Sequence, residues 1–194
     1  MTRITSRIRK FKKDLKDNGI TDGKIVKKYV LFGTPYIFEK NEEAYFNLKE
    51  EIADHFSISI TNVVMTGSAR LGFSIKPGKL WTHISSDSDI DIAIIHEGTF
   101  DRYWKDLFEF NVNITPRSTE EDTQFRKFLE YLFKGWIRPD LFPFNYQGKK
   151  EWFEFTRKLY NKYDNRKLSI GIFRNEYFFE NYQISNIKTI RGGL

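Results

Sequence analysis

Apolar positions recur every three or four residues over several long stretches of the chain, which predicts amphipathic helices. The helices predicted in this way cover residues 3–17, 41–56, 100–110, 118–136, 152–163 and 175–190. Asn41, which precedes two glutamates, and Ser118, which lies three residues before Glu121, are typical N-terminal caps. Asn18-Gly19 is expected to end the first helix in a left-handed cap, and a loop with Gly33 and Pro35 is expected to follow.

Short apolar or alternating segments between these helices predict strands. They lie at residues 63–65, 90–95 and 168–172. Helices and a few strands in this order indicate a mixed α/β (α+β) fold, in which a small mixed sheet is flanked by several helices. No repeat and no long linker divides the chain. We therefore expect a basic N-terminal segment over residues 1–38 and one domain over residues 39–194.

Composition narrows the class of protein. The chain has 194 residues, of which 40% are hydrophobic and 17% aromatic, so it can bury a sizeable core. The absence of cysteine excludes disulfides and thiolate metal sites. No apolar run approaches the roughly 18 residues that a membrane span needs. We expect a cytoplasmic protein without membrane contact. Trp104, Trp136 and Trp152 fall in predicted helices and are expected to be core residues rather than base-stacking platforms.

Positive charge is concentrated near the N-terminus. Residues 1–30 hold ten Lys or Arg against three Asp, whereas the rest of the chain holds 22 basic and 23 acidic residues. A basic segment on a near-neutral body suggests a phosphate-rich partner such as RNA. A solvated helix face would explain the same pattern, because charge alone carries little specificity.

Residues at the end of one apolar segment and at the start of the next indicate the chemistry of the site. Gly67-Ser68 ends the run that begins at Val63, and Asp89-Ile90-Asp91 opens the next strand. Because strand side chains alternate, Asp89 and Asp91 are expected on one face, about 7 Å apart along the strand. Two such carboxylates can hold Mg²⁺ together with substrate phosphate oxygens, and small residues let backbone N–H groups approach phosphates. A solvent-facing strand end is the alternative for Asp89 and Asp91 taken alone.

Two common phosphate-binding motifs are excluded. Gly67 and Gly72 have the spacing of a P-loop, but Phe73-Ser74 follows instead of lysine and serine or threonine. The glycine pattern of dinucleotide-binding folds is also absent.

Taken together, Thr66-Gly67-Ser68 and Asp89-Ile90-Asp91-Ile92 resemble the nucleotidyltransferase superfamily of the DNA polymerase β type. That pattern is a hydrophobic residue, Gly-Gly or Gly-Ser, a gap, and then two acids separated by a hydrophobic residue. The wider stretches are similar to small bacterial nucleotidyltransferase-like proteins and, more distantly, to cyclic-oligonucleotide synthases of antiviral signalling. The resemblance covers residues 44–96.

The resemblance implies transfer of a nucleoside monophosphate from a nucleoside triphosphate, with ATP expected, and release of pyrophosphate. The acceptor would be a protein, an RNA end or another nucleotide. Gly67 and Ser68 would hold the β- and γ-phosphates, while Asp89 and Asp91 would ligate two Mg²⁺ ions. Arg70 and Lys76 are candidates for phosphate contact, because their charge would offset that of the triphosphate. For Lys76, a solvated loop position is an equal alternative.

The chain departs from the family pattern in two places. The gap from Ser68 to Asp89 is long, and its Lys76, Lys79, Trp81 and His83 are expected to form a loop over the nucleotide. The third carboxylate of the family is not found on the strand at 168–172. Asp140 is its candidate, although a helix-ending turn explains Asp140 equally well.

These departures leave two hypotheses for function. The first is an Mg²⁺-dependent nucleotidyltransferase, by analogy in a toxin–antitoxin or phage-defence system. The second is a catalytically weak or inactive nucleotide- or RNA-binding partner subunit with the same fold.

Overall fold

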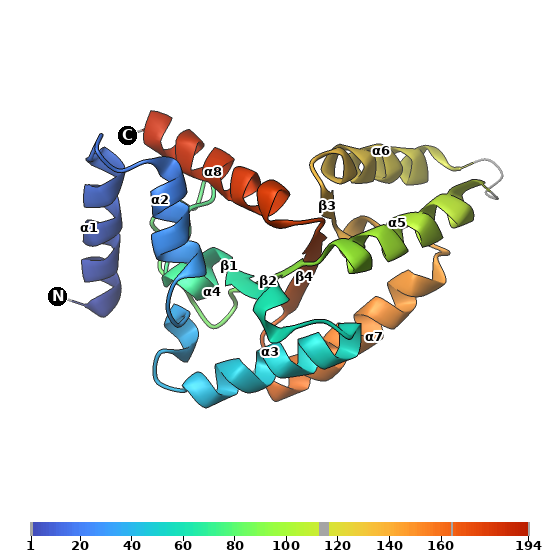
Figure 1. Ribbon diagram of the computed structural model, residues 1–194, viewed down its shortest axis with the longest axis horizontal. Coiled ribbons are helices and arrows are strands. Elements are labelled where there is room, and N and C mark those ends of the chain that lie inside the picture. The colour runs from blue at the N-terminus through green and yellow to red at the C-terminus, as the bar shows by residue number, and fades with distance from the viewer. Residues whose placement is uncertain (1, 113–116, 164, 194) are drawn as a thin grey trace.

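The computed structural model describes residues 2–112, 117–163 and 165–193. A four-stranded sheet lies at the centre and helices cover both of its faces (Figure 1). The strands are β1 (Val63–Thr66), β2 (Ile90–Ile95), β3 (Trp136–Ile137) and β4 (Leu168–Phe173). Their order is β1-β2-β4-β3, and β2 and β4 are parallel while both outer pairs are antiparallel. This architecture confirms the predicted α+β class with a small mixed sheet.

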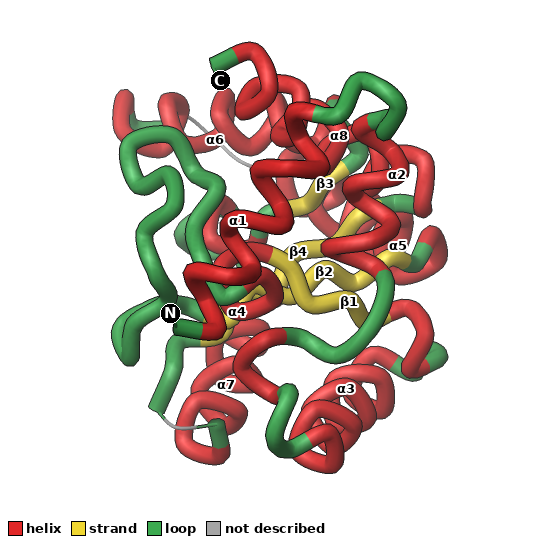
Figure 2. The backbone as a smooth tube through the Cα atoms, turned by 90° about the vertical axis from the view of Figure 1, so that its left-hand side faces the viewer, coloured by secondary structure: helices red, strands yellow, loops and turns green. Residues whose placement is uncertain are grey.

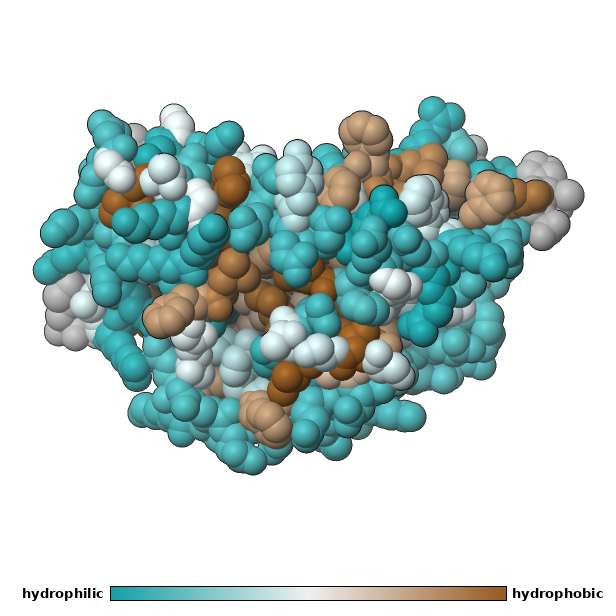
Figure 3. All heavy atoms as spheres, viewed as in Figure 1, coloured by the Kyte–Doolittle hydropathy of each residue, from teal (hydrophilic) through white to brown (hydrophobic). Residues whose placement is uncertain are grey.

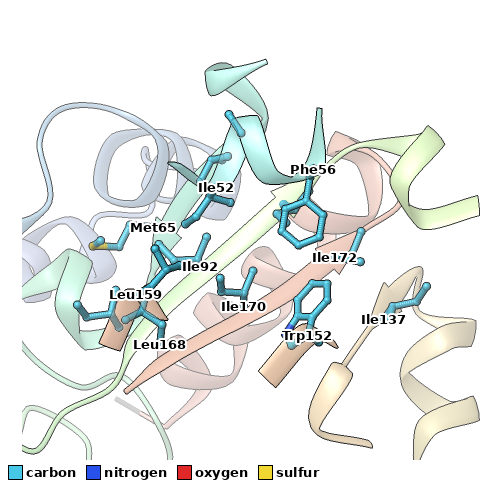
Figure 4. Close-up of a cluster of buried hydrophobic side chains, with 14 of the residues drawn as sticks. Ile52, Phe56, Met65, Ile92, Ile137, Trp152, Leu159, Leu168, Ile170 and Ile172 are labelled. Atoms are coloured by element: carbon cyan, nitrogen blue, oxygen red, sulfur yellow. The ribbon is translucent and has the colours of Figure 1, made fainter. Parts of the chain in front are cut away.

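One face of the sheet packs against the longer helices of the middle of the chain. They are α3 (Glu42–Phe56), α5 (Glu97–Val112), α6 (Thr119–Phe133) and α7 (Gln147–Lys162). Ile92 of β2 and Ile170 of β4 point to this side, where Ile52 and Phe56 of α3 and Trp152 of α7 meet them (Figure 4). Every second residue of the strands is buried here, as the alternation in the sequence predicts.

The opposite face carries helices from both ends of the described chain. These are α1 (Arg3–Lys16), α2 (Asp22–Val26) and α8 (Glu176–Gly192). Figure 2 shows them on the other side of the sheet from α3 and α7. Phe11, Leu15 and Ile25 are buried with Phe179 and Ile187 of α8 in a second core. The basic segment is therefore packed into the fold and not attached to it as a loose arm.

The N-terminal region differs from the sequence expectation in two details. Gly19 does not adopt a left-handed conformation, because α1 already ends at Lys16, with Asp17 as its extended cap. The expected loop contains α2, whose first turn is capped by the Thr21 side chain. A π-turn over Lys27–Leu31 continues directly from α2. Ile25, Val26 and Val30 are buried in this stretch, so packing stabilises a helix too short to be read from periodicity.

Two of the tryptophans also depart from their expected positions. Helix α6 ends at Phe133, and Trp136 lies on β3 instead of in the helix. Trp104 is 44% exposed on α5, and Phe108 and Val112 follow it at four-residue spacing on the surface. Figure 3 shows apolar side chains over the outer ends of α5 and α6, whereas hydrophilic residues dominate over α1 and α2. Trp152 is a buried core residue as expected, and Trp136 packs half-buried against the second core.

A short helix follows the edge strand β1 and leads toward β2, and these two strands position the site. Helix α4 (Gly67–Leu71) begins immediately after β1, and β1 pairs with β2 so that Thr66 lies opposite Asp91. A long loop then runs from Gly72 to Asp89 before β2 begins. Among the described residues, no helix combines the length and the apolar composition needed to span a bilayer.

Candidate functional site

Gly67 and Asp91 meet where β1 passes into α4. Gly67 has a φ of +66°, which favours glycine. A Cβ atom at this position would lie 2.2 Å from Oδ2 of Asp91, far inside van der Waals contact. Glycine is therefore required here for two reasons, its backbone conformation and the approach of the carboxylate. The structure brings together the two motifs that are 24 residues apart in the sequence.

A cavity of about 910 Å³ opens on the face of the sheet that carries Asp91. Ser68, Asp89, Asp91, Lys76 and Asp140 all line it, together with Gly67. Asp89 and Asp91 are partly exposed toward the cavity, while Ile90 and Ile92 are buried at 1% and 3% exposure. The alternation of β2 thus places both carboxylates on the cavity side.

Asp91 is an uncompensated acid. Its carboxylate accepts no hydrogen bond and forms no ion pair with any described residue. Burial and then the charge of Asp89 raise the pKa of Asp91 to about 6, against the opposing effect of Lys76, Lys167 and Arg138. A buried carboxylate without a partner is costly, and a cation would offset that cost. Asp89 and Asp91 are therefore suitable ligands for a divalent metal ion.

The long loop supplies positive charge to the cavity. Lys76, Lys79 and His83 line it, as do Ser74 and Ser85. The loop is fixed at its base by a bridge between Phe73 and His83 and by hydrogen bonds between Ser74 and the backbone of Trp81 and Thr82. Trp81 packs on Phe11 of α1, and the ammonium group of Lys12 lies 4.5 Å from the centre of its ring. Figure 2 shows a long loop beside α1. Trp81 anchors this loop to α1, and Lys76 and Lys79 line the cavity.

Arg70 has a structural position that differs from the expected phosphate contact. Its side chain is 3% exposed and it is not among the cavity residues. The guanidinium donates to the carbonyl oxygens of Tyr29, Phe32 and Gly33, with Nε 3.0 Å from that of Tyr29. Through these three hydrogen bonds, Arg70 of α4 holds the end of the π-helical turn in place. The structure therefore corrects the sequence assignment of Arg70, because its donors are turned away from the cavity.

Asp140 lines the cavity but is paired with Arg138, which lines it as well. Arg138 donates to both of its carboxylate oxygens, with Nη2 2.7 Å from Oδ2 and Nε 3.2 Å from Oδ1. The guanidinium of Arg138 also lies over the ring of Tyr131. Within the described residues, no group of three or more acidic or histidine side chains gathers in a form that could hold a metal ion.

Several cavity residues were not identified from the sequence. Ser169 lies directly across from Asp91 in the parallel pairing of β2 and β4. Trp136 stands on β3 at the far wall, and α8 contributes one face over the cavity, formed by Tyr182, Gln183, Asn186, Thr189 and Ile190. Gln183, Asn186 and Thr189 recur every three residues along α8, so a polar stripe on the last helix was the available signal.

Comparison with known proteins adds no relative to this description. No protein-family model matches the chain, and no curated protein and no solved structure matches it at a significant level. The site is therefore interpreted from its own residues and geometry.

Proposed function

We propose that this chain binds a nucleoside triphosphate with Mg²⁺ in the cavity and transfers its nucleoside monophosphate to an acceptor hydroxyl. The observation that supports the proposal is the contact between Gly67 and the unpaired carboxylate of Asp91 beside Ser68 and Asp89. ATP is the expected donor. The acceptor, whether a protein, an RNA end or another nucleotide, remains a prediction, as does the setting in a toxin–antitoxin or phage-defence system.

Asp89 and Asp91 are the residues that would hold the metal. When bound, Mg²⁺ neutralises phosphate oxygens and lowers the pKa of a coordinated hydroxyl. The two carboxylates lie on one side of β2. Gly67 covers one side of the Asp91 carboxylate, and the other side faces the cavity. The cavity side is thus the open side of this acid pair.

Ser68, Lys76 and Lys79 are suited to the phosphates. The Ser68 hydroxyl lines the cavity without a hydrogen bond to any described residue, so it can donate to a phosphate oxygen. The two lysines are exposed on the loop above it and supply point charges. In the reaction the acceptor oxygen bonds to the α-phosphorus and the bond from that phosphorus to the bridging oxygen breaks. Pyrophosphate leaves, and the hydroxyl proton passes to water.

A second candidate function is nucleotide binding without transfer, in a subunit that acts through a partner protein. Two specific observations favour it. Ser169 is a neutral residue next to Asp91 on the neighbouring strand, and the Asp140 carboxylate is paired with Arg138. A nucleotide could then be held by the lysines and the acid pair while the acceptor hydroxyl lacks a strongly basic neighbour.

Label transfer separates the two candidates. The purified chain is incubated with each α-³²P-labelled triphosphate, Mg²⁺ and total RNA or cell protein. Transfer predicts that label enters one fraction with wild type and Asp54→Asn, an exposed carboxylate on α3, but not with Asp91→Asn. Nucleotide binding measured by calorimetry without any transfer supports the second candidate. If wild type neither binds nor transfers, both candidates are wrong.

A further inference from the structure

Helix α8 covers part of the cavity and lines it with Tyr182, Gln183 and Asn186. The floor of this part is made by Ala93 and Gly171, which are neighbours across β2 and β4. The small size of these residues leaves room above the sheet. Trp136 uses part of that room, since a Cβ atom at Gly171 would lie 2.4 Å from its Nε1. The indole of Trp136 therefore lies against the backbone of β4 and forms a flat wall.

Two polar groups in this part of the cavity lack partners. Gln183 is only 8% exposed and lines the cavity, and its carboxamide forms no hydrogen bond with any described residue. Nε1 of Trp136 is buried and also has no hydrogen-bond partner. Asn186, one turn along α8, differs because it interacts with the Tyr182 hydroxyl and lowers its pKa against the effect of burial. A buried donor without a partner costs about 1 to 3 kcal/mol, so Nε1 of Trp136 points to a ligand that would satisfy it. The carboxamide of Gln183 is open to the cavity and is free to bond the same ligand.

The chemistry here differs from that at the phosphate end. The unpaired groups are a carboxamide, which donates and accepts, and an indole N–H, which donates. Both are neutral, and the nearby Arg138 is paired with Asp140. Trp136, Tyr131 and Tyr182 provide aromatic surface along the same walls. Aromatic surface combined with neutral donors and acceptors suits a flat heterocycle with a hydrogen-bonding edge.

We propose that the nucleobase of the bound nucleotide lies beneath α8, where Gln183 and the indole N–H of Trp136 bind its edge. Gln183 is then the residue that determines which base is accepted. This inference rests on the proposed binding of a nucleoside triphosphate, because the phosphates must lie at the Ser68 and Lys76 end. A single cavity joins the two ends, and Tyr182 is close enough to Asp91 for their charges to interact.

The experiment measures dissociation constants of ATP, GTP, CTP, UTP and inorganic tripolyphosphate by calorimetry with Mg²⁺. The variants are wild type, Gln183→Leu and Gln147→Leu, a matched change at an exposed glutamine of α7. We expect wild type and Gln147→Leu to prefer one base. In Gln183→Leu we expect the preferred triphosphate to bind at least about tenfold more weakly and the base preference to shrink, with tripolyphosphate binding unchanged.

Thermal unfolding of the free proteins gives a second readout. If Gln183 awaits a ligand, replacing its unpaired carboxamide by Leu leaves Tm unchanged or raises it, whereas a structural glutamine would lower Tm on replacement. An unchanged base preference in Gln183→Leu overturns the inference. If tripolyphosphate binds wild type as tightly as each nucleoside triphosphate does, the inference about the base is wrong, while the proposed phosphate site is still supported. Failure of all five ligands to bind wild type overturns the proposed function and the inference together.

Discussion

Gly67 lies against the Asp91 carboxylate so closely that a single methyl group would reach 2.2 Å from Oδ2. The contact joins the turn after β1 to the acid-bearing strand β2, and it fixes the carboxylate relative to Ser68. A substitution at Gly67 should therefore affect the site more than an equally strained glycine elsewhere.

Gly67→Ala tests this relationship. We expect loss of Mg²⁺ and nucleotide binding, because Asp91 must move, and a fall in the free energy of unfolding beyond the roughly 1 to 2 kcal/mol of a left-handed alanine. Gly33→Ala is the matched control, since Gly33 has a φ of +82° and no atom within 4 Å of the added Cβ. Urea unfolding and calorimetry provide the measurements. Equal losses in both variants would show that the carboxylate contact has no special weight.

The raised pKa of Asp91 predicts how the free energy of unfolding depends on pH. Its folded pKa of about 6 exceeds the ordinary 3.8, mainly because of burial and then because of Asp89. Between these values the folded chain keeps a proton that the unfolded chain has released. The free energy of unfolding should therefore fall as the pH rises from about 4 to 6.

Asp91→Asn should abolish this fall in the free energy of unfolding with rising pH. We expect the variant to be more stable than wild type at pH 7 without divalent metal, by at most about 2 to 3 kcal/mol, and equally stable near pH 4. Added Mg²⁺ should stabilise wild type at pH 7 and leave the variant unchanged. Chemical denaturation at several pH values measures both effects. A variant that is less stable than wild type at pH 7 contradicts the assignment of an uncompensated carboxylate.

Ser169 is the position where a third carboxylate would meet Asp91. Strands in a sheet are about 4.8 Å apart, so Ser169→Asp should create a closer acid cluster. We expect Mg²⁺ affinity at pH 8 to rise by about tenfold, with Ser169→Asn as the uncharged control. Should the wild type bind nucleotide without transfer, label transfer by Ser169→Asp would show that the missing acid limits catalysis. Weaker Mg²⁺ binding in this variant would mean that the metal lies away from β4.

Arg70 is predicted to support the fold and not the phosphates. Arg70→Lys leaves at least two of the three backbone carbonyls without their present donor, so we expect a loss of about 2 to 4 kcal/mol in the free energy of unfolding. Tripolyphosphate affinity of the folded variant should stay within about twofold of wild type, whereas Lys76→Gln should weaken it. A loss of affinity in Arg70→Lys without loss of stability would restore Arg70 to the phosphate site.

The exposed side of α1 carries a basic stripe formed by Arg9, Lys10, Lys13 and Lys16, opposite the buried Phe11 and Leu15. If the acceptor is RNA, Arg9→Gln, Lys13→Gln and Lys16→Gln together should lower the salt dependence of RNA binding by about 0.7 per lost phosphate contact. Filter binding over a range of salt concentrations measures the slope. Unchanged affinity and slope would leave the stripe as a solvated face.

Point substitutions are needed for this test because truncation would damage the fold. Phe11, Leu15, Ile25 and Val30 are buried in the second core, so deletion of residues 1–30 is expected to unfold part of the chain.

Elements with a long apolar period could be predicted from the sequence alone. The capping box of Ser118 and Glu121 forms as expected, and Asn41 caps α3 through its side chain. Alternation along β2 placed Asp89 and Asp91 on one side, and the Gly67-Ser68 pair was identified from its residue types. These features depend on neighbours within a few residues, so local patterns contain them.

Features that depend on distant partners could not be predicted. The carbonyl partners of Arg70 come from residues about 40 positions earlier in the chain. Strand β3 has two residues and exists through its pairing with β4, while α2 is held by packing on α8. The unpaired state of Gln183 becomes visible only when α8 lies over the sheet. A sequence pattern shows which face of one helix or strand is apolar. These features depend instead on contacts between two elements.

Because α8 forms one wall of the cavity, the cavity is complete only after this helix has packed on the sheet. During synthesis the acid pair, the lysine loop and the floor of the cavity emerge from the ribosome before residues 183–190. A nascent chain can therefore collapse around Asp91 while the surface beneath α8 is still open to water. The proposed recognition of a nucleobase should therefore appear late, when α8 docks on α2 and the sheet, whereas an immature chain would present only the proposed phosphate site.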